Sequence, residues 1–211
     1  DPYDTARIRA LGVIDLPSFY MDMEAAREGD TGANFRSTTR DVRRILKEFN
    51  EQGVDAVVLD LRQNGGGSLT EAINLTGLFI DEGPVVQVKD SGGRIQAYND
   101  LEGGMAWDGR LGGLSSKFSA SASEILAGTI RDYGRGLIVG DEATHGKGTV
   151  QSLLDLGSQV FRIPNPPNLG ALKITMQQFY RPNGESTQKR GVIPDLKLPS
   201  LTNYIGMGEA D

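Results

Sequence analysis

Apolar residues recur at helical spacing in the stretch that follows Thr38. Four of them fall at positions i, i+3, i+4 and i+7 and therefore share one face of a helix. They are Val42, Ile45, Leu46 and Phe49. Thr38 and Asp41 have the spacing of a capping box, which predicts that the helix is capped at Thr38. Gly53 is typical of the residue that ends a helix.

A nearly unbroken apolar run at residues 54–61 predicts a strand that is buried on both faces of a sheet. It leads into a polar, glycine-rich segment at residues 62–67 and then into a second stretch of helical periodicity. The periodic positions of that stretch are Leu69, Ala72, Ile73, Thr76 and Phe79. A strand, a glycine loop and a helix in this order are typical of an α/β fold.

The rest of the pattern predicts short elements of both kinds. We expect strands at residues 10–16, 136–139, 149–156 and 172–179, and a hairpin of residues 85–88 and 94–98. A further helix is expected at residues 121–133, with Gly134 as its stop. Loops are expected at residues 24–34 and 164–167, and a loosely held tail from Pro199. The pattern as a whole predicts one layered α/β domain.

Composition excludes several classes of function. The 211 residues carry 22 Lys and Arg against 28 Asp and Glu, and this acidic balance disfavours nucleic acid as a partner. The absence of cysteine excludes a thiol nucleophile, a thiolate metal site and disulfides, and a single histidine excludes a polyhistidine metal site. No apolar stretch approaches about 18 residues, so we expect no transmembrane segment. Glycine is enriched, with 28 residues, which predicts many tight backbone positions.

Small residues crowd the start of the helix expected from residue 121, in the string FSASASE at residues 118–124. A helix N-terminus offers unpaired N–H groups and the positive end of the helix dipole. A serine at that place can present its hydroxyl beside donors that stabilise an oxyanion. The alternative interpretation is that these serines only cap the helix.

The string GKGTVQ at residues 146–151 places a lysine between two glycines. The glycines allow another backbone or a substrate to come close. In an extended segment, Lys147, Thr149 and Gln151 share one face and point into the same cleft. A lysine that is desolvated in a cleft holds its proton less tightly and can act as a general base.

Two other interpretations of this region fit less well. A phosphate-binding loop is disfavoured, because five residues separate Gly140 from Gly146 and Gly148 stands where Ser or Thr is needed. A Ser-His-Asp triad would have to use His145, the sole histidine, and the sequence contains no G-x-S-x-G elbow. We therefore expect His145 to be a solvated loop residue.

A glycine triplet follows the apolar run, in the string DLRQNGGG at residues 60–67. Glycines that follow a buried strand supply bare N–H groups suited to an anion or a developing oxyanion. The alternative is a plain turn from strand to helix.

In order and spacing, DLRQNGGG, FSASASEI and GKGTVQ together resemble the C-terminal processing peptidases, also called tail-specific proteases. The similarity continues in QFYRPNG at residues 178–184, STQ at 186–188 and GVIPD at 191–195. It covers residues 10–198, and several motifs in register make it specific.

This resemblance implies a serine-lysine dyad, with Ser121 as the nucleophile and Lys147 as the general base. It implies that Gln151 orients the lysine. The implied oxyanion donors are the amides of Ala122 and Gly67, with Gly66 as the second choice, and Glu124 is a supporting residue ranked below Gln151.

The resemblance also implies a ClpP/crotonase-like α/β fold with a single catalytic domain. We expect an N-terminal junction at residues 1–9, the peptidase core at 10–198 and a C-terminal tail at 199–211. The implied activity is that of a serine endopeptidase, without cofactor or metal, that cleaves near the apolar C-termini of unfolded, tagged or precursor proteins. Protein and peptide substrates are the expected partners, and the periplasm or cell envelope is the expected location.

The sequence departs from the family pattern in two places. Family members usually carry a PDZ domain that captures the substrate tail, and we find none in the 211 residues, although we expect one in the full-length protein. Gly112 and Gly113 also weaken the strand expected before the nucleophile.

Two alternatives to a peptidase are a silent member of the same fold that binds peptide or an apolar ligand, and a thioester-handling crotonase-type enzyme. The co-occurrence of Ser121, Lys147 and Gln151 favours the peptidase over the silent module. The family motifs in the C-terminal half of the chain argue against the thioester enzyme.

Overall fold

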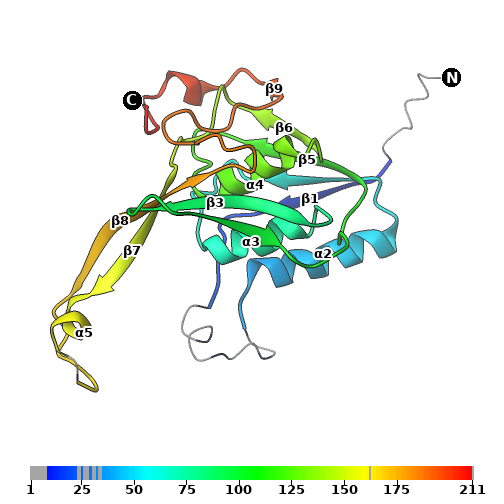
Figure 1. Ribbon diagram of the computed structural model, residues 1–211. Helices are drawn as coiled ribbons and strands as arrows, with labels where there is room; N and C mark the ends of the chain where they lie inside the picture. Colours follow the sequence, from blue (N-terminus) through cyan, green and yellow to red (C-terminus); the bar gives the residue numbers. More distant parts are fainter. Residues whose placement is uncertain are drawn as a thin grey trace.

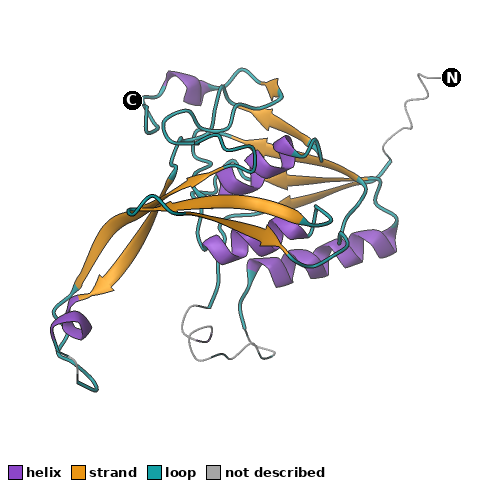
Figure 2. Cartoon of the chain, viewed as in Figure 1, coloured by secondary structure: helices purple, strands orange, loops and turns teal. Residues whose placement is uncertain are grey.

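The protein is built from two β-sheets with helices between them, as the computed structural model shows for residues 9–22, 25, 29, 32, 35–161 and 163–210 (Figures 1 and 2). The first sheet is parallel and has the order β1-β2-β5-β6-β9. Its strands are β1 (Leu11–Asp15), β2 (Ala56–Asp60), β5 (Arg110–Ser115), β6 (Leu137–Gly140) and β9 (Leu196–Lys197). The layered α/β architecture predicted from the sequence is confirmed.

The second sheet is antiparallel and has the order β4-β3-β8-β7. Its strands are β3 (Gly83–Asp90), β4 (Ile95–Asp100), β7 (Thr149–Asp155) and β8 (Ala171–Tyr180). The helical segments are α2 (Thr38–Gln52), α3 (Leu69–Gly77), α4 (Ala122–Asp132), α5 (Leu156–Val160) and the 3₁₀ turn η1 (Leu201–Tyr204). Helix α4 touches β6 of the first sheet and β3 of the second, which places it in the core between them.

The parallel sheet buries only one of its faces. Ile14 is buried against the helices, whereas Leu11 and Val13 on the other face of β1 are 53% and 57% exposed. Val58 of β2 is likewise only half-buried, so the prediction of a strand buried on both faces is wrong. The alternation of buried and exposed residues in β1 follows from the two-residue period of a strand.

The ends of α2 correct one prediction and confirm another. The cap is Ser37, whose hydroxyl accepts a hydrogen bond from the Arg40 N–H at 3.2 Å, and not Thr38. Thr38 instead donates its hydroxyl to the Tyr20 carbonyl at 2.9 Å, which ties the helix start to the preceding chain. Gly53 ends the helix with a φ of 67°, a left-handed conformation that glycine adopts without strain.

The glycine-containing strand β5 lies in the middle of the parallel sheet, so the expectation of a weak strand is wrong. Gly112 pairs with Val58 on one side and Leu137 on the other. A Cβ atom on Gly113 would lie 2.9 Å from the Ile138 Cδ1, which shows that glycine lets this neighbour pack closely. Pairing on both sides holds the strand that leads to residue 121.

The chain after Pro199 is better anchored than the sequence predicts. Residues 201–204 form η1, the Thr202 hydroxyl donates to the Asp141 carboxylate, and the Glu209 N–H donates to the His145 carbonyl at 2.9 Å. The loop expected at 24–34 lies outside the described residues except at 25, 29 and 32. None of the described helices is long and apolar enough to cross a membrane.

Candidate active site

The three serines of FSASASE have different surroundings. Ser119 and Ser123 are fully buried, and their hydroxyls donate to the carbonyls of Leu61 and Asn64, both at 2.8 Å. These bonds fasten the start of α4 to the segment that carries the glycine triplet. Ser121 lies at the wall of a cavity, which leaves it as the serine of this string that a substrate can reach.

Ser121 also has an unusual backbone. It precedes the first residue of α4 with a φ of 57° and a ψ of −111°, a conformation that residues with a side chain rarely adopt. Such strain costs on the order of 1–3 kcal/mol and is found mostly at functional sites, where the surroundings enforce it. The geometry places the serine at a sharp turn into the N-terminus of α4, where the Ser123 and Glu124 amides are bonded to the Ala120 and Ser121 carbonyls and no hydrogen bond among the described residues uses the Ala122 N–H.

Glu124 joins the serine segment to the lysine segment. Its side chain is fully buried and accepts the Ser121 N–H at 2.7 Å and the Lys147 N–H at 3.0 Å on one oxygen. The other oxygen accepts the Thr144 hydroxyl at 2.6 Å and the Gly146 N–H at 2.7 Å. Since all of these partners donate, the carboxylate fixes the two segments relative to each other.

Burial and hydrogen bonding act on Glu124 in opposite directions. Desolvation raises its pKa from the ordinary 4.5 to about 7, while the hydrogen bonds from Thr144, Gly146, Ser121 and Lys147 work to lower it. Desolvation is the larger of these effects. The carboxyl that holds the site together therefore titrates near neutral pH.

The glycines beside Lys147 permit close contact with another part of the chain. A Cβ on Gly146 would lie 2.9 Å from the backbone carbon of Lys189, and one on Gly148 would lie 2.6 Å from the Gln188 nitrogen. The Gly148 N–H donates to the Gln188 side-chain oxygen at 2.8 Å. The STQ string at 186–188 thus packs against the GKG string and positions the lysine.

Among the described residues, the amide of Gly66 in the glycine triplet is used in a hydrogen bond, whereas no hydrogen bond uses those of Gly65 and Gly67, which both line the cavity. The Gly66 N–H donates to the Asn64 side chain at 2.9 Å, whereas no hydrogen bond among the described residues uses the Gly67 N–H or the Ala122 N–H. A Cβ on Gly66 would lie 2.9 Å from the Ser121 Cβ and 3.2 Å from the Ala122 nitrogen, so the loop touches the start of α4. This pattern favours Gly67 over Gly66 as an oxyanion donor.

A cavity of about 520 Å³ brings most of the predicted site residues together. Its walls include Gly67, Ser68, Ser121, Ala122, Lys147, Thr149, Gln151 and Lys173. Glu124 and Gly66 are not among the lining residues. No hydrogen bond between described residues joins Gln151 to Lys147, so the orienting role of Gln151 stays a prediction.

His145 is not among the residues that line the cavity. Its backbone N–H donates to the Ser119 carbonyl at 3.0 Å, and its buried Nδ1 has no hydrogen-bond partner among the described residues. The expectation of a fully solvated histidine is therefore wrong, because the segment 144–146 is drawn against the serine loop. No hydrogen bond among the described residues joins Ser121 to either His145 or Lys147, but Lys147 lines the cavity with Ser121 and His145 does not, which favours Lys147 as the base.

Sequence reasoning missed two polar residues that support the site. Asn64 is fully buried, and its side chain donates to the Leu16 carbonyl at 2.8 Å while accepting the Gly66 N–H. Thr144 accepts the Val192 N–H at 2.7 Å and donates to Glu124. The position of Asn64 directly before the glycines is the signal that could have identified it.

The chain is similar to known peptidases. The model of peptidase family S41 matches residues 10–198. The tail-specific protease of Haemophilus influenzae is 41% identical over 199 residues, which cover 94% of this chain and 26% of that protein. The chloroplastic C-terminal processing peptidase of Tetradesmus obliquus is 35% identical over 167 residues, which cover 79% of this chain and 34% of that protein.

Solved structures show the same architecture. The photosystem II D1 C-terminal processing protease has a TM-score of 0.70 and 32% identity, over 89% of this chain and 42% of that one. Mature CPAF has a TM-score of 0.67 at 15% identity and shares the fold. The chain spans about a quarter to a third of the length of the two curated relatives named above.

Proposed function

The chain belongs to peptidase family S41, and we propose that its 211 residues act as a serine endopeptidase with a Ser121–Lys147 dyad. The observation that carries this proposal is the cavity in which Ser121, Lys147 and two available amides meet. The names of the relatives as C-terminal processing and tail-specific proteases support it.

In the proposed mechanism, neutral Lys147 removes the proton from the Ser121 hydroxyl as the oxygen attacks a peptide carbonyl. The amides of Gly67 and Ala122 donate to the oxyanion of the tetrahedral intermediate. Lys147 returns the proton to the leaving amine, which departs and leaves an acyl group on Ser121. Water, deprotonated by the same lysine, then releases the acyl group and restores the serine.

We propose that the substrates are unfolded, tagged or precursor proteins cut near apolar C-termini, in the periplasm or cell envelope. The substrate preference rests on the relatives' names and on the resemblance, and the location rests on the resemblance alone. A PDZ domain that delivers the tail in the full-length protein is part of the same proposal.

The test is to incubate the 211-residue chain with a fluorophosphonate and, separately, with an unfolded protein that ends in an apolar tail. We expect covalent labelling at Ser121, cleavage of the protein, and loss of both in Ser121→Ala. A folded chain that neither labels nor cleaves would favour the silent binding module of the same fold.

A further inference from the structure

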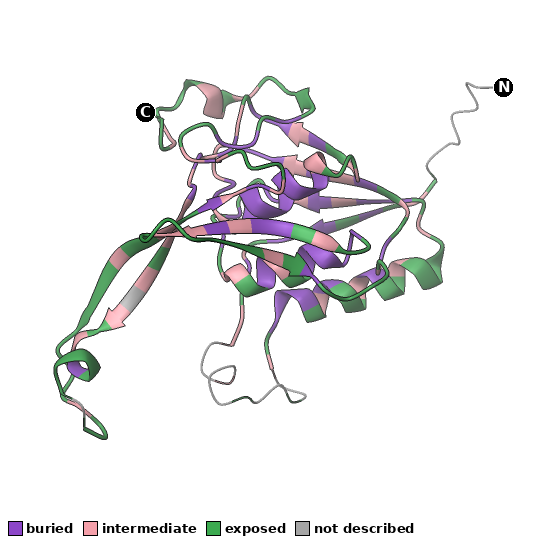
Figure 3. Cartoon of the chain, in the orientation of Figure 1, coloured by how far each residue is buried: buried purple, intermediate pink, exposed green. Residues whose placement is uncertain are grey.

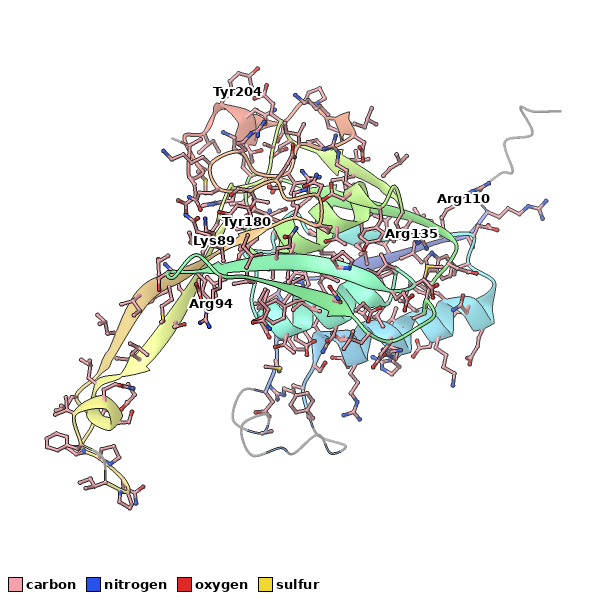
Figure 4. All side chains as sticks on the ribbon, viewed as in Figure 1. Lys89, Arg94, Arg110, Arg135, Tyr180 and Tyr204 are labelled. Carbon is pink, nitrogen blue, oxygen red and sulfur yellow. The ribbon has the colours of Figure 1, made fainter. Side chains whose placement is uncertain are left out.

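The strands β7 and β8 leave the body of the protein as an arm that ends in α5 and the loop after it (Figures 1 and 3). Apolar side chains along this arm are exposed to solvent, and Figure 4 shows the arm's side chains projecting on both sides. They include Val160 at 63%, Ile163 at 57%, Leu169 at 49% and Leu172 at 48% exposure. Grouped exposed apolar side chains mark a surface that binds something apolar.

The outer edge of β7 is unpaired among the described residues. β7 is the last strand of its sheet and pairs only with β8 in the part of the chain that the structure describes. Its sequence, TVQSLLD, contains no proline or lysine, the residues with which proteins usually protect an edge strand. An edge of this kind can accept an additional strand through main-chain hydrogen bonds.

The outer edge of β7 begins beside the candidate active site. β7 starts two residues after Lys147, and its first residues, Thr149, Val150 and Gln151, all line the cavity that contains Ser121. Side chains of a regular strand alternate between its two faces, so a cavity on one face would be lined by every second residue. Three consecutive lining residues therefore indicate that the cavity lies at the edge of β7. The pairing with β8 is irregular at this point, since Val150 pairs with Gln177 and Gln151 with Thr175, which leaves Met176 without a partner in β7.

We propose that an extended, apolar segment of the polypeptide substrate docks on the arm as an added strand along the outer edge of β7. This inference rests on the proposed peptidase function and names how the substrate is held. The main-chain bonds accept any sequence that has no secondary structure of its own, and the apolar side chains of the arm favour hydrophobic substrate residues. A segment bound this way leads directly to Lys147 and Ser121.

The first test measures binding without catalysis. Ser121→Ala is mixed with a soluble, unstructured peptide of about ten residues, close to the length of a typical strand, with leucine at every second position. Hydrogen exchange of the backbone amides is then followed by NMR. We expect slower exchange at alternating residues of β7, the pattern of a strand paired on one edge. Saturating peptide that leaves the β7 amides unprotected overturns the proposal, whatever the catalytic state of the wild-type protein.

The second test uses charge on the arm. Val160→Asp and Ile163→Asp are combined in one double variant, and it is expected to fold because both replaced side chains are exposed. For an unfolded protein substrate we expect KM to rise by about tenfold in the double variant, with kcat and fluorophosphonate labelling of Ser121 unchanged. Leu101→Asp, at 86% exposure in a loop away from the arm, is the matched control and is expected to cleave like wild type.

The outcomes separate the two proposals. Labelling and cleavage by the double variant at the wild-type KM would show that the arm does not hold the substrate, while the peptidase function stands. Absence of labelling in the wild-type chain would overturn the peptidase function, and the exchange experiment would still decide whether β7 binds peptide.

Discussion

The body of the protein, which contains the candidate site, and the arm formed by β7, β8 and α5 differ in how firmly they hold their residues. Glu124 is fully buried and accepts four hydrogen bonds from the segments that carry Ser121 and Lys147. On the arm, by contrast, most residues of β8 are exposed, and α5 and the following loop extend into solvent. The contrast fits the two proposals, with reaction geometry in the body, where several hydrogen bonds hold each segment, and substrate binding on the arm, where a partner can still add contacts.

The largest expected effect comes from the body. Lys147→Ala should reduce kcat by about 10²–10⁴ or more, because it removes the proposed general base. Lys173→Ala is the matched control, since Lys173 lines the same cavity from the arm and should change KM only. Steady-state kinetics on an unfolded protein substrate measure both. Wild-type kcat in Lys147→Ala would rule out the dyad and redirect attention to His145, whose own replacement by alanine should leave most activity intact.

The second prediction for the body concerns Glu124, the carboxylate that joins the serine segment to the lysine segment. Glu124→Gln puts an NH₂ group against N–H and O–H donors, so one pair of the four hydrogen bonds must be lost. A displacement of the dyad of about 1 Å would lower kcat by on the order of 10². Circular dichroism confirms folding and kinetics on the same sample give kcat.

Glu71→Gln is the control for burial as such. Glu71 is also buried and accepts the Ser37 hydroxyl at 2.9 Å and the Thr39 N–H at 2.7 Å, and it is not among the residues that line the cavity, although Thr70 before it is. It should lower stability but leave kcat of the folded protein near wild type. Equal loss of kcat in the two variants would mean that Glu124 acts through general stability and not through the position of the dyad.

The residues of the candidate site also show how much of the structure can be predicted from the sequence. Lys147 was singled out by a local pattern, a lysine between two glycines, whereas the choice of Ser121 among the serines of the helix start came from the family resemblance, and the catalytic roles of both stay predictions. The β5 strand was misjudged for a physical reason, since Gly113 lets the Ile138 side chain of the neighbouring strand pack closely, a contact that local propensity does not contain.

The supporting contacts were harder to predict for the same reason. Thr144 and Glu124 are 20 residues apart in the chain, and their hydrogen bond depends on how α4 meets the lysine segment. The arm is another example, because the pattern predicts its two strands but not that they leave the body. Local patterns and the resemblance thus point to the candidate reacting groups, and tertiary packing determines which contacts hold them.

The titration of Glu124 predicts a pH dependence of stability. Its pKa is about 7 in the folded protein and 4.5 ordinarily, so folding favours the protonated form. The stability that protonated Glu124 contributes to the folded protein is therefore fully present below pH 4.5 and is lost as the pH rises through about 7. Between pH 5 and pH 8 the loss should be on the order of 2 kcal/mol in wild type and absent in Glu124→Gln.

Urea unfolding of both proteins across this range measures the difference. Carboxyls such as Asp60, whose pKa is lowered mainly by its hydrogen bond with the Arg62 side chain, act in the opposite direction and at lower pH. Parallel curves for the two proteins between pH 5 and pH 8 would show that Glu124 does not titrate there.

The smallest expected effect concerns the terminal carboxylate of the substrate. On the arm, a substrate strand would be held by its main chain and its apolar side chains, and neither depends on whether its C-terminus is charged. Reading of a free terminus by a PDZ domain uses a backbone nest, and delivery from a second site raises the local substrate concentration, often to millimolar. The 211 residues tested alone should therefore cleave a peptide with a free terminus and its amidated twin with kcat/KM values that differ by less than about tenfold, or about 1.4 kcal/mol.

A larger preference for the free terminus would mean that the core itself reads the tail. Lys173 of the arm, the cation nearest in sequence to the exposed apolar tip among the residues that line the cavity, would then be the first residue to replace.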